Sequence, residues 1–114
     1  MEYKVEHSSL AERDLDTVFE HLASRLKAYN SARNMLDDYK SKLAGLQYNP
    51  HLHALLKIKA LSGMDYRWFN FGSCYAVYNV DEKKHTVYIV RVFIRNKTMK
   101  AIFNQADQDG DSTI

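Results

Sequence analysis

Apolar residues recur with two different periods along this chain, and the change of period divides it into a helical half and a stranded half. Residues 9–28 and 31–47 carry apolar positions three and four apart, which is the spacing of an amphipathic helix. From residue 64 to residue 95 the period is two, which indicates strands. An alternating stretch over residues 2–8 predicts one more strand before the first helix.

Candidate caps and helix breakers set the ends of these elements. Ser9 followed by Glu12 has the spacing of a capping box, and Asn30 suits the cap of the second helix. Pro50 ends the helical half, because proline has no amide with which to continue a helix. Residues 51–63 fit a short helix or an extended connection, and the pattern does not choose between them.

The order of the elements predicts an α+β fold. It runs through an N-terminal strand, a two-helix hairpin, a three-stranded antiparallel sheet and a short C-terminal helix over residues 96–103. The helical hairpin should cover one face of the sheet and leave the other face at least partly open. We expect one domain over residues 1–103 and a polar, flexible tail over residues 104–114.

The Gly72-Ser73 pair predicts a tight turn between the first two strands of this sheet. That turn pairs Phe71 with Cys74, and residues paired across strands share a face. The face toward the helices then holds Arg67, Phe69, Phe71, Cys74, Ala76, Tyr78 and Val80. The opposite face holds Tyr66, Trp68, Asn70, Tyr75, Val77 and Asn79.

The last strand is apolar at both alternating sets of positions, as a central strand should be. The arginines identify the set that should point away from the helices, which is Val87, Ile89, Arg91, Phe93 and Arg95. The other set, expected to point toward the helices, is Tyr88, Val90, Val92 and Ile94.

The open face of the sheet would therefore combine Tyr66, Trp68, Asn70, Tyr75, Arg91 and Arg95. Planar rings and guanidinium groups suit unstacked bases and phosphates. They suit a protein partner equally well, because Tyr, Trp and Arg are the usual anchors of interfaces. A third interpretation is that the terminal helix folds over them.

Composition limits the classes of function. The chain has 114 residues, a formal net charge of +2 and a single cysteine, Cys74, so an internal disulfide is excluded. No apolar run is long enough for a membrane span, and the N-terminus lacks the pattern of a secretory signal, so we expect a cytoplasmic protein without a membrane partner. Residues 83–100 carry Lys and Arg but no acid, which suits phosphate and is equally typical of a solvated strand end.

Other candidate chemistry is weak. His51 and His53 offer two metal ligands without a third, and residues 107–111 (DQDGD) hold only part of a calcium loop. Cys74 falls on the core face with no activating neighbour, and His85 stands at the start of a strand. We therefore expect no metal and no cofactor.

Several stretches in a fixed order carry a resemblance to a known family. They are A-x-x-D-L at residues 11–15, the two-helix hairpin, and YRWFNFGSCYAVYNVDEKKHTVYIVRVFIRNKTMKAI at residues 66–102. Over residues 3–103 the chain resembles the RelE/ParE superfamily of bacterial toxins, the toxic halves of type II toxin–antitoxin modules. The resemblance implies an antitoxin as partner, docked on the helical hairpin and the sheet edge.

The resemblance implies one of two mechanisms. RelE-like members cut mRNA in the ribosomal A site, whereas ParE-like members bind DNA gyrase. Under the RelE-like mechanism, which we expect, the catalytic residues are Arg95, Tyr75 and Arg91, and the RNA-binding residues are Trp68, Tyr66, Lys97 and Lys100. In this sequence Tyr75 stands where that group has an arginine. The alternatives are a non-enzymatic gyrase inhibitor and a catalytically inert antitoxin-binding protein.

Overall fold

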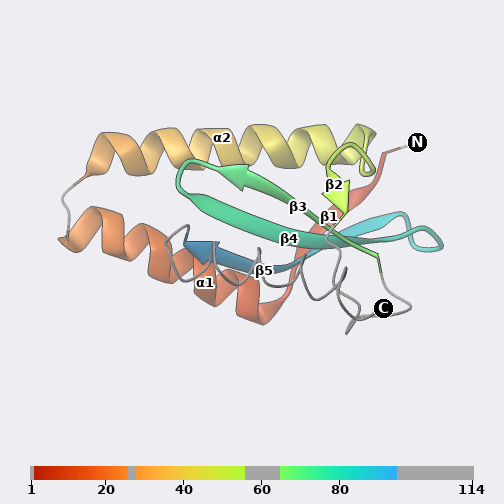
Figure 1. Ribbon diagram of the computed structural model, residues 1–114, viewed down its shortest axis with the longest axis horizontal. Helices are drawn as coiled ribbons and strands as arrows, with labels where there is room; N and C mark the ends of the chain where they lie inside the picture. The colour runs from red at the N-terminus through yellow and green to blue at the C-terminus, as the bar shows by residue number, and fades with distance from the viewer. Residues whose placement is uncertain (1, 26–27, 56–64, 95–114) are drawn as a thin grey trace, which may run out of the picture.

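Two helices and a five-stranded sheet make up the part of the chain that the structure describes, residues 2–25, 28–55 and 65–94 of a computed structural model. In chain order the elements are β1 (Lys4–His7), α1 (Ser9–Glu20), the π-helical turn η1 (His21–Arg25), α2 (Tyr29–Tyr48), β2 (Ala54–Leu55), β3 (Tyr66–Phe71), β4 (Cys74–Asp81) and β5 (Thr86–Ile94). Figure 1 shows α1 and α2 running alongside the strands and joined at one end of the molecule.

The sheet is larger than expected, although the predicted α+β class is confirmed. Its strand order is β1-β5-β4-β3-β2, with β1 parallel to β5 and the other pairs antiparallel. The predicted N-terminal strand and the three antiparallel strands after residue 64 are confirmed as β1, β3, β4 and β5. The additional strand is β2, which has two residues and is too short to show a period.

Both predicted helix caps were wrong. The N-cap of α1 is Ser8, whose Oγ accepts a hydrogen bond from Ala11 N at 3.0 Å. The same Oγ donates to Val90 O at 2.8 Å, so the cap of α1 is also bound to β5. Asn30 lies inside α2, and the residue at the N-cap position, Ala28, makes no side-chain cap. The α2 helix ends at Tyr48, two residues before Pro50, as predicted.

The core lies between the helices and one face of the sheet. The predicted β3–β4 hairpin is confirmed, with Phe71 paired to Cys74 around Gly72, whose φ is 54°. Five residues of its predicted core face are buried, namely Phe69, Phe71, Cys74, Ala76 and Tyr78. They pack with Ala11, Val18, Met35, Tyr39 and Leu46 of the helices. Burying a large apolar side chain in this way contributes about 1.5–3 kcal/mol.

A bulge in β5 makes the predicted alternation of that strand partly wrong. Val77 pairs with Arg91 but Tyr78 pairs with Ile89, so Val90 is an extra residue. Val87 and Ile89, expected on the open face, therefore share the core face with Tyr78 and are fully buried. Tyr88, expected toward the helices, pairs with Asn79 on the open face. Beyond the bulge the expectation holds, with Val92 in the core.

Several expectations fall on residues outside the described ranges. They are the C-terminal helix over 96–103, the tail over 104–114, and most of the segment 51–63, of which Ala54–Leu55 is a strand. No helix in the described ranges is long and apolar enough to cross a membrane.

Candidate functional site

The open face of the sheet carries rows of side chains that the strand register places side by side. One row is Tyr66, Asn79 and Tyr88, the next is Trp68, Val77 and Arg91, and the third is Asn70, Tyr75 and Phe93. The rings of Trp68 and Tyr75 are 5.3 Å apart and meet edge to face at 77°. The predicted grouping of Tyr66, Trp68, Tyr75 and Arg91 on one face therefore agrees with the register.

An ion pair holds Arg91 against the first helix. Arg91 Nε donates to Asp14 Oδ2 at 2.8 Å and Arg91 Nη2 donates to Asp14 Oδ1 at 3.2 Å. The hydrogen bond that Arg91 donates to Asp14 is the main cause that raises the pKa of Arg91. The guanidinium also lies 5.1 Å from the centre of the Phe93 ring. Arg91 thus already has a bidentate carboxylate partner in the folded protein.

Ser8 and Asp14 hydrogen-bond to the backbone at the edge of β5, beyond the end of β1. Ser8 N donates to Ile89 O at 2.9 Å, and Val92 N donates to Asp14 Oδ2 at 2.9 Å. The bulge at Val90 lies between these two contacts. A side chain of α1 therefore satisfies a strand amide that a longer β1 would otherwise satisfy.

A groove of about 440 Å³ lies between the two helices. Its lining includes Leu15, Leu36 and Leu43 as apolar residues, Glu12, Asp16 and Lys40 as charged ones, and His7 and Tyr39. His7 Nε2 and Tyr39 Oη share a hydrogen bond of 2.6 Å. Burial lowers the pKa of His7, against a smaller opposite effect of Glu12, and burial raises the pKa of Tyr39.

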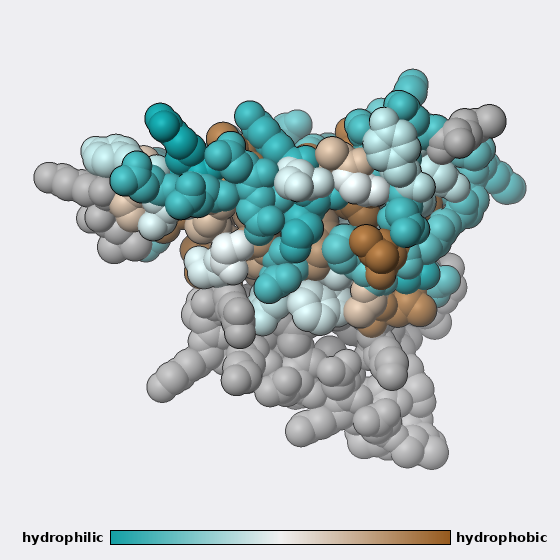
Figure 2. Space-filling view, turned by 90° about the horizontal axis from the view of Figure 1, so that it is seen from above, coloured by the Kyte–Doolittle hydropathy of each residue, from teal (hydrophilic) through white to brown (hydrophobic). Residues whose placement is uncertain are grey.

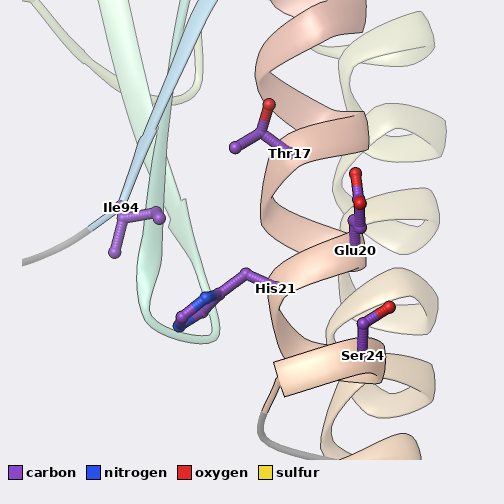
Figure 3. Close-up of a pocket in the computed structure, with 5 residues that line it drawn as sticks. All are labelled: Thr17, Glu20, His21, Ser24 and Ile94. Atoms are coloured by element: carbon purple, nitrogen blue, oxygen red, sulfur yellow. The ribbon is translucent and has the colours of Figure 1, made fainter.

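A second pocket, of about 390 Å³, lies between α1, η1 and the end of β5. Thr17, Glu20, His21, Ser24 and Ile94 line it, and in Figure 3 the ring of His21 extends from the helix toward the side of the pocket where Ile94 lies. Thr17 Oγ1 donates within the helix to Arg13 O at 3.0 Å. Its lining is mixed, and nothing in it points to one class of ligand.

A comparison with known sequence families identifies the family of this chain. A sequence model described as the ParE toxin of the type II toxin–antitoxin system parDE matches residues 5–99. The chain belongs to the ParE toxin family. No curated protein matches the sequence.

Solved structures of toxin–antitoxin proteins share the fold of this ParE-family chain. The chromosomal ParDE system from P. aeruginosa aligns with a TM-score of 0.61 and 18% identity, over 82% of this chain and 97% of that one. The RelBE2 complex from Mycobacterium tuberculosis aligns with a TM-score of 0.55 and 23% identity, over 83% and 93%. The archaeal RelE–RelB complex from Pyrococcus horikoshii aligns with a TM-score of 0.53 and 18% identity, over 85% and 99%. These chains are toxin–antitoxin proteins of the RelE/ParE superfamily, as the resemblance implied.

The structure describes four of the seven predicted site residues of this ParE-family toxin. Tyr66, Trp68, Tyr75 and Arg91 lie on the open face, and each has partners within the protein. Arg95, Lys97 and Lys100 lie outside the described ranges. Their assigned roles, like those of the other four, stay predictions.

Sequence reasoning did not single out His7 and Tyr39, and it gave Asp14 no role beyond the A-x-x-D-L motif. The motif held the signal for Asp14, because Asp14 lies three positions after the buried Ala11 and four before the buried Val18, on the same side of the helix. No comparable signal marks His7. His7 is one more polar residue of the alternating stretch over residues 2–8. Its partner Tyr39 lies 32 positions away in the chain.

Candidate metal ligands do not gather in the part of the chain that the structure describes, where no group of three His, Cys, Asp or Glu could hold an ion. His51 is instead hydrogen-bonded to Glu82 through Nε2 and Oε1. Tyr3 donates to the other carboxylate oxygen of Glu82 at 2.7 Å. His53 lies apart from that pair, with its ring 5.2 Å from the centre of Phe69.

Proposed function

We propose that this toxin inhibits growth by binding a protein target, DNA gyrase in the ParE-like manner, and that an antitoxin holds it inactive. The observation that most directly supports this proposal is the Asp14–Arg91 ion pair. A nuclease needs cations held where negative charge develops at the phosphate, with that charge as their main partner. Arg91 already has its charge met by a carboxylate, and this favours an interface role for the open face. The match of residues 5–99 to the ParE family supports the same proposal.

The groove between α1 and α2 is the proposed docking site for the antitoxin. Its apolar walls and charged rims fit one amphipathic helix, because such a helix buries an apolar stripe and leaves charges at its sides. Leu36 is suited to anchor that helix, since it lines the groove and the residue is 37% exposed. Acids on the α1 rim and Lys40 on the α2 rim would set its orientation.

A gene-level observation and a binding assay test the antitoxin proposal. A small protein encoded beside this gene should bind the purified toxin, and Leu36→Glu should abolish or strongly weaken the complex. Ser41→Glu is the matched control, because Ser41 is an exposed α2 residue outside the groove lining. If both variants bind equally well, the groove is not the docking site.

Ribosome-dependent mRNA cleavage is the second candidate function. Trp68 and Tyr75 favour it, because two aromatic rings on the face that carries Arg91 suit stacked bases. In that mechanism the Tyr75 hydroxyl would exchange a proton, Arg91 and Arg95 would meet the phosphate, and Tyr66, Lys97 and Lys100 would hold the RNA.

Tyr75→Phe separates the two mechanisms, because it removes the hydroxyl and keeps the ring against Trp68. A nuclease should lose activity by roughly 10²–10⁴-fold, as expected for loss of a group that transfers a proton. A gyrase inhibitor should keep its activity. The measurements are mapped transcript ends and gyrase–DNA adducts in antitoxin-free cells that express wild type, Tyr75→Phe or Arg95→Ala. A-site cleavage that the variants lose would overturn the gyrase proposal, and absence of any growth defect in wild type would leave only antitoxin binding.

A further inference from the structure

Three basic side chains from separate segments meet at the link that precedes β2. They are Lys42 of α2, His53 of the link and Arg67 of β3, and we call them the basic cluster. Lys42 Nζ lies 6.0 Å and the His53 ring 5.2 Å from the centre of the buried Phe69 ring. Arg67 Nη1 donates to His53 O at 2.7 Å. The fold therefore gathers two permanent cations and one imidazole in a single region of the surface.

The two permanent charges of the basic cluster are held by neutral acceptors. Lys42 Nζ donates to Asn70 O at 2.9 Å, and Arg67 Nη1 donates to His51 O at 3.2 Å as well as to His53 O. A carbonyl oxygen accepts a hydrogen bond but carries no net charge, so these contacts orient both cations without neutralising them. Within the described ranges neither cation takes part in a side-chain ion pair. The cluster thus presents a local positive potential.

The His53 imidazole responds to this unmatched charge. Burial is the main cause that lowers its pKa, and the charges of Lys42 and Arg67 lower it further, with no described carboxylate acting in the opposite direction. Tyr78 of β4 meets the ring edge-on, with ring centres 6.1 Å apart. Its hydroxyl donates to Pro50 O and stays uncharged, because burial raises the pKa of Tyr78 to about 12. A titratable group that cations hold in its neutral form is typical of a site for an anion.

The described residues beside His53 in the chain are apolar and indicate which kind of anion fits. Leu52 and Leu55 are 64% and 45% exposed. Figure 2 shows hydrophobic side chains gathered near the end of α2 where β2 lies, on a surface that is otherwise largely hydrophilic. A nucleic-acid backbone repeats its charge at every nucleotide and binds to a row of cations. Two cations and one imidazole among leucines match a single small oxyanion better.

We propose that the basic cluster binds a phosphate dianion, either free phosphate or the terminal phosphate of a small phosphomonoester. Its oxygens would accept hydrogen bonds from the remaining N–H groups of Lys42 and Arg67. The His53 imidazole would take up a proton from solvent and become a third donor. The bound anion would then connect α2, the link before β2 and β3. This site does not depend on how the toxin inhibits growth, and none of its residues lines the groove between α1 and α2.

An NMR titration of the full chain with inorganic phosphate tests the proposal. Ionic strength is held constant with sodium chloride, so that general screening does not change during the titration. The His53 ring resonances should shift to saturation, and the pH midpoint of His53 should rise, because the dianion offsets the two neighbouring cations. His21, at an exposed position on η1, is the matched control and should keep its midpoint. The proposal is wrong if His53 shows no saturable shift, or if both midpoints rise equally.

Charge variants of α2 show whether the basic cluster holds the anion. Lys42→Met keeps an unbranched stem beside Phe69 and removes the charge, so it should weaken phosphate binding by about three- to ten-fold, the scale of a partly exposed charge pair with a dianion. Lys42→Arg should restore most of the binding. Arg33→Met removes a charge at an exposed position in the first half of α2 and should leave phosphate binding unchanged. Equal loss in both methionine variants, or no loss in either, would overturn the proposal.

Two further ligands distinguish the source of the phosphate. If adenosine monophosphate binds more tightly than inorganic phosphate, the site takes a phosphomonoester, and if it binds equally or more weakly, the site takes free phosphate. A single-stranded oligonucleotide without terminal phosphates should not displace either ligand. An oligonucleotide that binds more tightly than both, and that Lys42→Met weakens, would show that the basic cluster contacts a nucleic-acid backbone instead.

Discussion

Asp14 of α1 and Arg91 of β5 form a bidentate ion pair across 77 positions of the chain, and the same carboxylate accepts the amide of Val92. The Asp14 side chain is 18% exposed and that of Arg91 is 42% exposed, so the pair is partly screened by solvent. The hydrogen bond from Val92 N to Asp14 should therefore contribute to stability as much as the ion pair does. The Asp14 carboxylate connects α1 to β5, the last described strand. It also pairs with the charge of Arg91, an arginine of the open face.

Removal of this carboxylate should destabilise the fold. Asp14→Ala leaves the Val92 amide and the Arg91 guanidinium without their acceptor, which should cost about 1–3 kcal/mol. Asp14→Asn keeps an oxygen for the amide and should cost less. Urea unfolding of the three proteins measures both values. Equal stability of wild type and Asp14→Ala would show that water replaces the carboxylate at no cost.

Two glycines should respond to alanine in opposite directions. Gly72 has a φ of 54°, and a Cβ there would meet Met35 Cγ at 2.3 Å. Gly72→Ala should therefore destabilise the protein by about 1–2 kcal/mol from the backbone conformation alone, with the contact adding to this. Gly45 lies inside α2, and a Cβ added there would have nothing within 4 Å, so Gly45→Ala should stabilise by about 0.5–1 kcal/mol. Thermal unfolding of both variants compares the signs directly.

Local sequence patterns predicted the β3–β4 hairpin correctly. They failed for β5, where contacts with segments distant in the sequence accompany a change of register. The Gly72-Ser73 turn gave the whole β3–β4 register, because one turn fixes every pair that follows it. The bulge at Val90 reversed the face of Val87 and Ile89, and it lies where Ser8 and Asp14, from another part of the chain, bind the backbone of β5. No periodicity within β5 contains that information.

In the candidate site, too, local patterns predicted the face of a residue but not its contacts with other elements. Alternation placed Tyr66, Trp68 and Tyr75 on one face, because that depends only on the turn. The state of Arg91 depends on a carboxylate of another element, and Lys42 and His53 meet at the Phe69 ring from separate segments of the chain. Residue type and spacing identify candidates, whereas the pairing of their charges is a property of the fold.

Cys74 should be unreactive while the protein is folded. The residue is 1% exposed, and burial raises the pKa of the thiol to about 11. At pH 8 the thiolate, which is the reactive form, is therefore scarce and inaccessible. A thiol-specific chromogenic reagent should react slowly with the native protein and rapidly in denaturant. Rapid reaction without denaturant would mean that the β3–β4 hairpin opens readily.

Mild acid should destabilise the protein through His7 and His53. Burial holds the pKa of both imidazoles below the ordinary value of 6.5, so the folded state favours their neutral forms. Above pH 6.5 both the folded and the unfolded chain carry neutral imidazoles, and the stability is fully present. As pH falls below 6.5 the unfolded chain takes up protons first, and stability is lost until pH passes the lower pKa of the folded state. Urea midpoints should therefore fall between pH 7.5 and pH 5.5.

A histidine variant tests this cause at His7. His7→Gln keeps a polar group beside the Tyr39 hydroxyl and removes the titration, so its urea midpoint should fall less than that of wild type over the same pH interval. His21→Gln, at an exposed position on η1, is the matched control and should follow the wild-type curve. Comparison of slopes between pH 7.5 and pH 5.5 cancels any constant loss caused by the substitution itself. A His7→Gln slope equal to that of wild type would assign the acid sensitivity to other groups, with His53→Gln as the next variant to compare.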